Sequence, residues 1–195
     1  MEKFAIGKEF FERDPVVCAR ELIGCRFVWR GCAGRIVETE AYASEGDPAC
    51  HTFFRPSSRE FVARHPAGTA YVYLNYGVHW MFNVLVKGPR GEGFVLFRAL
   101  EPLEGLGKMS RRRRTEAPEA LCSGPGKLTQ ALGIDGNAHG RAFLARKTTG
   151  IFLDGRKNSA QIAADRRIGI RKGVELPWRF LAAESPFVSK PPENQ

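Results

Sequence analysis

Three absences in the sequence each exclude a class of protein. No run approaches the roughly 18 to 20 apolar residues that span a bilayer, and no basic start leads into an apolar secretory segment. The 5 cysteines include no C-x-x-C pair, so the sequence contains neither a disulfide framework nor a zinc or iron–sulfur signature. We expect a soluble protein that is not secreted, with reduced thiols in or near its core. It would be cytoplasmic or nucleoid-associated in a bacterium and nuclear in a eukaryote.

Acidic residues are the minority among the charged residues. The chain has 21 Asp and Glu against 30 Lys and Arg, a formal net charge of +9. Clustered basic side chains gain affinity for polyanions by displacing counterions from phosphates. Nucleic acid is therefore the first candidate partner and an anionic membrane surface the second. Charge alone also leaves open a merely basic soluble protein.

The length of 195 residues and the 43% hydrophobic content predict a single domain over residues 1–195. Asp14-Pro15 and Gly24 are start and stop signals for a helix over 14–24. CRFVW (25–29) and RIVETEAY (35–42) predict a β-hairpin through the loop RGCAG. Aromatic and β-branched residues over 69–86 predict strands on either side of Tyr76-Gly77, and 94–102 predicts another strand.

The other segments give weaker signals. Residues 43–68 have no clear period and predict a long functional loop, whereas 103–120, which contains Arg111, Arg112, Arg113 and Arg114, predicts an exposed helix and loop. SGPGKLTQALG (123–133) predicts a short helix ending at Gly133. IFLDG (151–155), RIGIRKG (167–173) and LPWRFLA (176–182) are further strand candidates. The polar, proline-rich tail at 190–195 predicts disorder.

Two carboxylates lie inside the strand predicted over 35–42. Alternation along a strand places Ile36, Glu38, Glu40 and Tyr42 on one face. If that face meets a pocket, an anionic carboxylate there can take a proton from water. The alternative is a solvated strand face, and the spacing alone favours this alternative for both glutamates.

Aromatic residues gather in YVYLNYG. Tyr71, Tyr73 and Tyr76 can stack on nucleobases or wedge between base steps, or they can belong to an ordinary aromatic core strand. Tyr76 differs from the others because a ring at a hairpin tip has little core to enter. His51 and His79 lie too far apart in sequence to resemble a zinc site.

Several stretches, taken in order, resemble one known family. They are FFERDPVVCARELIG, RIVETEAY, GTAYVYLNYGVHWMFNVL, FRALEPLEG, CSGPGKLTQALGI, RIGI and SPFVS, from about residue 10 to 189. The family is the alkyladenine (3-methyladenine) DNA glycosylases. This resemblance implies a single α+β domain with a curved, mainly antiparallel sheet, flanking helices and a β-hairpin that protrudes into the DNA minor groove.

The resemblance also implies an activity. The protein would be a monofunctional DNA glycosylase of base excision repair, which flips alkylated or deaminated purines out of the duplex and excises them hydrolytically. Its substrates would be of the 3-methyladenine, hypoxanthine and ethenoadenine class, and its product an abasic site. The partner would be double-stranded DNA containing a damaged purine, with no membrane partner, no metal and no organic cofactor, and the protein would be a monomer.

The resemblance carries roles to individual positions. Glu40 matches the general base that activates water, and Arg98 matches the arginine that helps to hold that water. Asn83 matches a side chain that crowds out the exocyclic amine of guanine, and Tyr76 matches the intercalating wedge. The residues that would sandwich the extruded base are Tyr42, His51 and Tyr73.

Two departures and two alternatives accompany the resemblance. TFFRPSSRE (52–60) stands where the family more often has a glycine-containing stretch and an Arg-Asn pair. Asn75 stands beside the wedge, where an aliphatic residue is expected. The lesion preference and the role of Glu38 are therefore open, as is the set of arginines that contacts phosphate. One alternative is a non-catalytic nucleic-acid-binding protein on the same fold, and the other is a small-molecule transferase without the exposed wedge.

Overall fold

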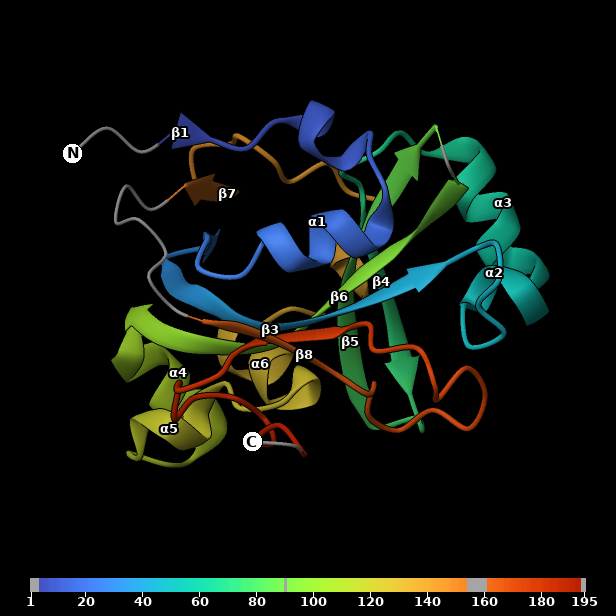
Figure 1. The fold of residues 1–195 in the computed structure, drawn as a ribbon. Coiled ribbons are helices and arrows are strands. Elements are labelled where there is room, and N and C mark those ends of the chain that lie inside the picture. Colours follow the sequence, from blue (N-terminus) through green and yellow to red (C-terminus); the bar gives the residue numbers. More distant parts are fainter. Residues whose placement is uncertain (1–3, 90, 154–160, 194–195) are drawn as a thin grey trace.

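The computed structural model describes residues 4–89, 91–153 and 161–193. Within them, strands pair in the order β1-β7-β2-β3-β6-β5-β4, and β9 joins β8 to β3 (Figure 1). The strands are β1 (Phe4–Ala5), β2 (Arg26–Trp29), β3 (Cys32–Ala43), β4 (Ala70–Asn75), β5 (His79–Gly88), β6 (Gly91–Glu104), β7 (Thr149–Leu153), β8 (Ile162–Asp165) and β9 (Arg179–Ala182).

Helices flank this sheet. They are the 3-10 helices η1 (Lys8–Phe11) and η2 (Gly136–Ala138), and the α-helices α1 (Pro15–Glu21), α2 (His51–Phe54), α3 (Pro56–Arg64), α4 (Leu106–Arg113), α5 (Pro118–Leu121) and α6 (Pro125–Leu132). The chain is a single α+β domain with an open, mainly antiparallel sheet, which confirms the predicted fold class. No helix of the described residues is long and apolar enough to cross a membrane.

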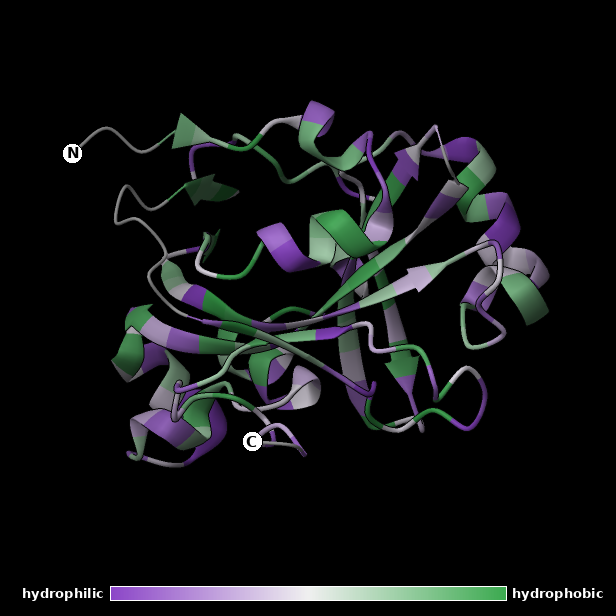
Figure 2. Ribbon diagram, in the orientation of Figure 1, coloured by the Kyte–Doolittle hydropathy of each residue, from purple (hydrophilic) through white to green (hydrophobic). Residues whose placement is uncertain are grey.

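The two faces of the central strands bury different kinds of side chain. On β6, Val95 and Phe97 point into the main core, whereas Leu96 and Arg98 point to the opposite face and line a cleft. Phe27, Phe82 and Phe97 form the centre of the main core, with ring centroids 5.1 to 5.4 Å apart. In Figure 2 the flanking helices carry both hydrophobic and hydrophilic residues, and α1 is hydrophobic over its first part and hydrophilic at its end. The opposite face buries a smaller hydrophobic cluster, which includes Leu85 and Phe94, and also carries the polar groups of the cleft.

Helix α1 begins as its sequence predicts. The carboxylate of Asp14 accepts hydrogen bonds from the backbone N–H groups of Val16 at 2.8 Å and Val17 at 3.1 Å, and Pro15 occupies the first turn. The helix packs on the main-core face of the sheet, where the Thr39 hydroxyl on β3 donates to the Ala19 carbonyl at 2.8 Å. This contact fixes which face of β3 points away from α1.

Both predicted hairpins form. The turn between β2 and β3 is shorter than the predicted loop, because Cys32–Gly34 pair with β2 and leave Arg30 and Gly31 at the tip. The β4–β5 hairpin turns at Tyr76 and Gly77, which have φ angles of 49° and 69°. Tyr76 is 87% exposed. The predicted placement of Tyr76 at a hairpin tip is therefore confirmed.

Two segment predictions are wrong. Residues 43–68 contain α2 and α3 rather than one long loop: α3 starts at Pro56 without a side-chain cap, and its Phe61 and Val62 are buried in a cluster with Tyr71. RIGIRKG (167–173) forms no strand and runs as an irregular segment beside the cleft. Packing against the rest of the fold, rather than local sequence signals, determines the structure of both segments.

Most of the remaining helix and strand predictions are confirmed. The helices at 103–120 and 123–133 are confirmed as α4 and α6, and part of 176–182 is confirmed as β9. β7 confirms a strand up to residue 153, while 154 and 155 lie outside the described residues. All 5 cysteines are free and buried, as expected. In the tail, the Glu193 N–H donates to Asp165 at 3.0 Å, and residues 194–195 lie outside the described part.

Close approach of β6 to β3 requires a glycine at position 93. A Cβ atom there would lie 2.0 Å from the Tyr42 carbonyl oxygen and 3.0 Å from Pro15. We expect Gly93→Ala to lower the free energy of unfolding by about 3 kcal/mol or more, because the strands must separate. Gly107→Ala is the matched control. A Cβ at Gly107 on α4 meets nothing within 4 Å, so the change should be neutral or stabilise by up to about 1 kcal/mol. Urea unfolding of both variants checks this, and equal midpoints would contradict it.

Candidate active site

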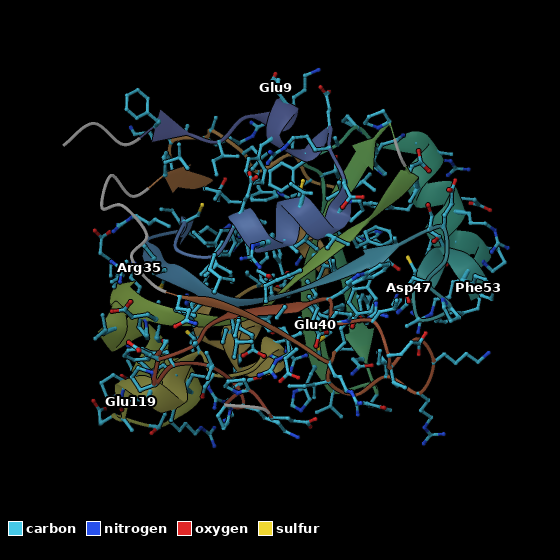
Figure 3. The ribbon with its side chains drawn as sticks, in the orientation of Figure 1. Glu9, Arg35, Glu40, Asp47, Phe53 and Glu119 are labelled. Carbon is cyan, nitrogen blue, oxygen red and sulfur yellow. The ribbon has the colours of Figure 1, made fainter. Side chains whose placement is uncertain are left out.

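Glu38 and Glu40 are both fully buried, with 0% exposure. The solvated-face alternative, favoured from spacing alone, is therefore wrong. The middle of β3 pairs with β6 along one edge and with β9 along the other, which leaves no edge open to water. Register shifts beside Glu38 accommodate the two partners. Glu40 lies near the middle of the ribbon (Figure 3).

Glu38 is held by two arginines and a serine. Its Oε1 atom accepts from Arg98 Nε at 2.9 Å, from Arg179 Nε at 2.8 Å and from the Ser189 hydroxyl at 2.8 Å, and its Oε2 accepts from the Ser189 N–H at 2.5 Å. Burial alone would raise the pKa of Glu38, but the charges of Arg98 and Arg179 lower it below the ordinary value. Glu38 is thus an anion that positions Arg98.

Glu40 has three donors around its carboxylate. Oε1 accepts from the Ile168 N–H at 2.7 Å and lies 3.2 Å from Arg98 Nη1, and Oε2 accepts from the Tyr42 hydroxyl at 2.7 Å. Burial, and then the charge of Glu40, raises the pKa of Tyr42 well above its ordinary value, so the phenol keeps its proton. Arg98, Tyr42 and Ile168 also line the cleft, so Glu40 lies directly beneath its floor.

The four residues assigned to base binding lie together. Tyr42, His51, Tyr73 and Asn83 line one inner pocket of about 20 Å³ with two further aromatic side chains, Tyr71 and Phe94. A cleft of about 570 Å³ shares Tyr42, His51 and Tyr73 with this pocket. The cleft also contacts Tyr76, so it reaches from the hairpin tip to the floor above Glu40.

Fixed contacts hold this pocket in shape. His51 Nδ1 lies 3.0 Å from the Tyr71 hydroxyl, and the His51 ring centroid lies 4.4 Å from that of Tyr73. Burial raises the pKa of Tyr73 to about 12. The Asn83 amide donates to the Tyr71 carbonyl at 3.2 Å. The polar ends of His51, Tyr71 and Asn83 are therefore each oriented by a neighbouring group.

Sequence reasoning missed the support behind Tyr42. Arg167 is paired with Asp47 through two bonds of 2.6 and 2.8 Å, and both side chains are buried. The guanidinium carbon lies 4.7 Å from the Tyr42 ring centroid and 5.3 Å from that of Trp178. Arg167 belongs to the quoted RIGI stretch, but its partner lies 120 residues away and gives no local signal.

The segment after Arg167 supplies the cleft with basic groups. Arg171 and Lys172 line it, and no carboxylate does so among the described residues. Phe54 also lines the cleft, from the divergent stretch 52–60, with its ring centroid 5.5 Å from that of His51. Phe53 next to it is exposed and lies far from Glu40 in the view of Figure 3. The divergent stretch thus borders the cleft.

Two of the four consecutive arginines are used within the fold. Arg112 Nη1 donates to the Ala131 carbonyl at 2.8 Å, and Arg113 Nε donates to the Leu121 carbonyl at 3.1 Å. Arg111 and Arg114 are exposed. Among the described residues, no group of three His, Cys, Asp or Glu side chains could hold a metal ion.

This arrangement suits acid–base chemistry on a flat, apolar ligand. A dry anion lies beneath an aromatic slot, and basic side chains surround the opening. Such a site can stack a planar ring, hold a phosphate-bearing chain at the rim and place a carboxylate near the atom that joins the ring to the chain.

Comparison with known proteins agrees with the resemblance found in the sequence. The family model for methylpurine-DNA glycosylase (MPG) matches residues 9–186. A relative from Bradyrhizobium diazoefficiens, named "Putative 3-methyladenine DNA glycosylase", is 45% identical over 186 residues, which cover 95% of this chain and 91% of the relative. Relatives of the same name from Salinibacter ruber and Agrobacterium fabrum are each 44% identical, covering 92% and 95% of this chain and 94% and 92% of the relative. The chain therefore belongs to the methylpurine-DNA glycosylase family: it is a DNA-repair hydrolase of the 3-methyladenine DNA glycosylase type, which acts on N-glycosidic bonds in DNA.

Proposed function

We propose that residues 1–195 act as one monofunctional glycosylase domain, as a monomer, on duplex DNA that contains a damaged purine. The enzyme flips the nucleotide into the cleft, hydrolyses its N-glycosidic bond and leaves an abasic site. Its substrates include 3-methyladenine, hypoxanthine and ethenoadenine. The observation that carries this proposal is the buried carboxylate of Glu40 beneath an aromatic slot.

Glu40 has one position left for a water molecule. A carboxylate offers about four acceptor sites. Ile168 and Arg98 occupy those of Oε1, and Tyr42 occupies one of Oε2. The free site on Oε2 would accept a proton from the water that attacks C1′, with Arg98 at the cleft floor as a second contact for that water. The same negative charge would stabilise the oxocarbenium-like sugar as the bond to the base breaks.

The slot favours electron-poor bases. Tyr42, His51 and Tyr73 present aromatic faces that stack well on an alkylated purine, whose positive charge adds a cation–π attraction. Burial, with a smaller effect of Arg55, lowers the pKa of His51 to about 4, so its ring is neutral at neutral pH and does not repel a cationic base. The anchored Asn83 amide would crowd the exocyclic amine of guanine.

Flipping a base out of the stack costs a few kcal/mol, and least for a damaged or mispaired base. Tyr76, the exposed tip of the β4–β5 hairpin at the edge of the cleft, would enter the gap and offset this cost. A non-catalytic binding protein would gain nothing from Glu38 and Glu40, since buried anions beneath a phosphate-binding surface only weaken binding.

Replacing Glu40 with Gln should abolish excision while DNA binding persists. The amide cannot take the proton from water, so we expect single-turnover excision to fall about 10² to 10⁴-fold. The assay uses duplexes containing hypoxanthine, ethenoadenine or 3-methyladenine, followed by alkali to cleave at abasic sites.

Glu45→Gln is the matched control, because Glu45 is an exposed glutamate just after β3. It should keep the wild-type rate. An undiminished rate in Glu40→Gln would refute the mechanism. Strand breaks before alkali treatment, or an adduct with Lys172 trapped by borohydride, would refute the monofunctional assignment.

Tyr76→Ala should impair excision most where the lesion is well paired, since the wedge matters most when the duplex resists opening. We expect about a tenfold greater loss for a lesion in a stable pair than for the same lesion in a mispair. Phe4→Ala, which removes an exposed aromatic ring from β1, serves as the control. Equal losses in both contexts would argue against the wedge.

The buried neutral state of His51 predicts a pH dependence of stability. The folded pKa of about 4 lies below the ordinary value of 6.5, so the unfolded chain binds the extra proton between these values. The free energy of unfolding therefore falls as pH drops from about 6.5 to about 4, with a contribution from His51 of at most about 1.4 kcal/mol per pH unit. Urea unfolding of His51→Gln should show a shallower slope there than wild type. An unchanged slope would contradict the assignment.

A further inference from the structure

A second cavity of about 450 Å³ lies away from the cleft. It is formed between the β2–β3 turn and the segment 141–149 that leads into β7. Its lining includes Trp29, Arg30, Arg141, Phe143, Arg146 and Thr148. Trp29 pairs with Cys32 at the start of β3, whereas Tyr42 is near the other end, a separation of about 30 Å at about 3.3 Å per residue. In Figure 1, β7 lies on the opposite side of the molecule from the tip of the β4–β5 hairpin.

The charges in this cavity are of one sign. Arg30, Arg141 and Arg146 line it, and within the described residues no carboxylate does. A guanidinium carries five N–H donors, and the side chain of Arg146 uses its Nε to reach the Ala142 carbonyl at 3.0 Å. Within the part of the chain that the structure describes, most of the donors of the three arginines therefore remain for a ligand. Three cations around one hollow repel each other unless an anion enters it.

A buried donor on the wall of the same cavity has no partner. Trp29 is 3% exposed, and its indole N–H makes no hydrogen bond within the described residues. Leaving such a group unpaired costs about 1 to 3 kcal/mol. The Arg30 guanidinium carbon lies 5.8 Å from the Trp29 ring centroid, so the indole and one cation are neighbours.

The backbone around the cavity is strained. Arg30 and Ala145 have φ angles of 46° and 50°, a region that costs non-glycine residues about 1 kcal/mol or more. A two-residue hairpin turn of this kind favours asparagine before glycine, yet the chain has Arg30 there. A hydrogen bond from Arg30 N to Thr148 O at 2.8 Å joins the two sides of the cavity, and one from Arg146 N to Thr149 O at 3.0 Å closes the turn within 141–149. The strained positions bring the arginines to one hollow.

We propose that this cavity binds a phosphate group at a site separate from the cleft. Planar guanidinium groups pair with phosphate oxygens through two parallel bonds, and the exposed side chains of Arg30, Arg141 and Arg146 can turn toward such a group. The group is carried either by a small phosphorylated molecule or by the backbone of DNA outside the lesion. The proposal does not depend on excision, because the site lies about 30 Å from the cleft along β3.

Thermal unfolding with inorganic phosphate or pyrophosphate tests the site, with sodium chloride at equal ionic strength as the reference. Ligand that binds the folded state raises Tm with concentration. We expect pyrophosphate to stabilise the wild type, and the double variant Arg141→Gln/Arg146→Gln to bind it at least tenfold more weakly. Trp29→Phe keeps an aromatic ring in the core and removes only a buried N–H, so it should bind pyrophosphate like the wild type.

The matched control is Arg20→Gln/Arg111→Gln, which also removes two positive charges, from exposed arginines that do not line the cavity. It should keep the wild-type response. If the Arg141/Arg146 variant responds like wild type, or if the control loses the same amount, the proposal is wrong. The four proteins need only fold, so failure of the proposed excision activity would leave this test unaffected.

Titration with undamaged duplex distinguishes the two sources of phosphate. If the DNA backbone occupies the site, duplex should compete with pyrophosphate, and the Arg141/Arg146 variant should lose about two units from the slope of log K against log salt, at about 0.9 per phosphate contact. An unchanged slope, together with lost pyrophosphate binding, assigns the site to a small phosphorylated molecule.

Discussion

The ion pairs between Arg98 and the two buried glutamates are the constraint on which the cleft depends. A lone charge in the protein interior costs several kcal/mol, and only well-placed partners offset this. Arg98 on β6 lies between Glu38 and Glu40 on β3, and Arg179 on β9 completes the set. Removing one partner would leave a buried charge uncompensated, so three strands are held in register at the place where the floor of the cleft forms. Glu40 itself is fully buried and has a single ion-pair contact with Arg98, at 3.2 Å.

A second buried ion pair, between Asp47 and Arg167, holds the wall of the slot in place. Asp47 anchors Arg167, and Arg167 stacks between Tyr42 and Trp178. Tyr42 is therefore fixed at its ring by a cation and at its hydroxyl by Glu40. The general base that we propose at position 40 would need placement to a fraction of an ångström, and rigid supports of this kind would provide it. By contrast, Tyr76 lies on a two-stranded hairpin tip and is free to meet DNA.

Local signals in the sequence identified the elements that form locally. Asp14 and Pro15 marked the start of α1, aromatic and β-branched residues marked β4 and β5, and Gly133 marked the end of α6. Helix α3 gave no such signal because Arg55 provides no cap and the helix depends on burying Phe61. Positions for Glu40, Arg98 and the base pocket came from the resemblance, and the structure brings them together. The contacts of Arg179 and Ser189 with Glu38 could not be predicted from the sequence. Each joins residues more than a hundred positions apart, and ordinary strand or loop patterns surround Arg179 and Ser189.

The distribution of charge connects these observations. A protein with a net charge of +9 attracts phosphate over much of its surface, so attraction alone cannot select a damaged base. Selection of a damaged base needs a negatively charged site within this positive surface. That site must be buried so that it does not repel the phosphates. The sheet provides it: carboxylates on the inner strands lie beneath aromatic rings, while Arg171 and Lys172 remain at the rim. In the mechanism proposed above, a backbone phosphate would meet Arg171 and Lys172 at the rim, and a base would have to leave the stack to reach the carboxylate below.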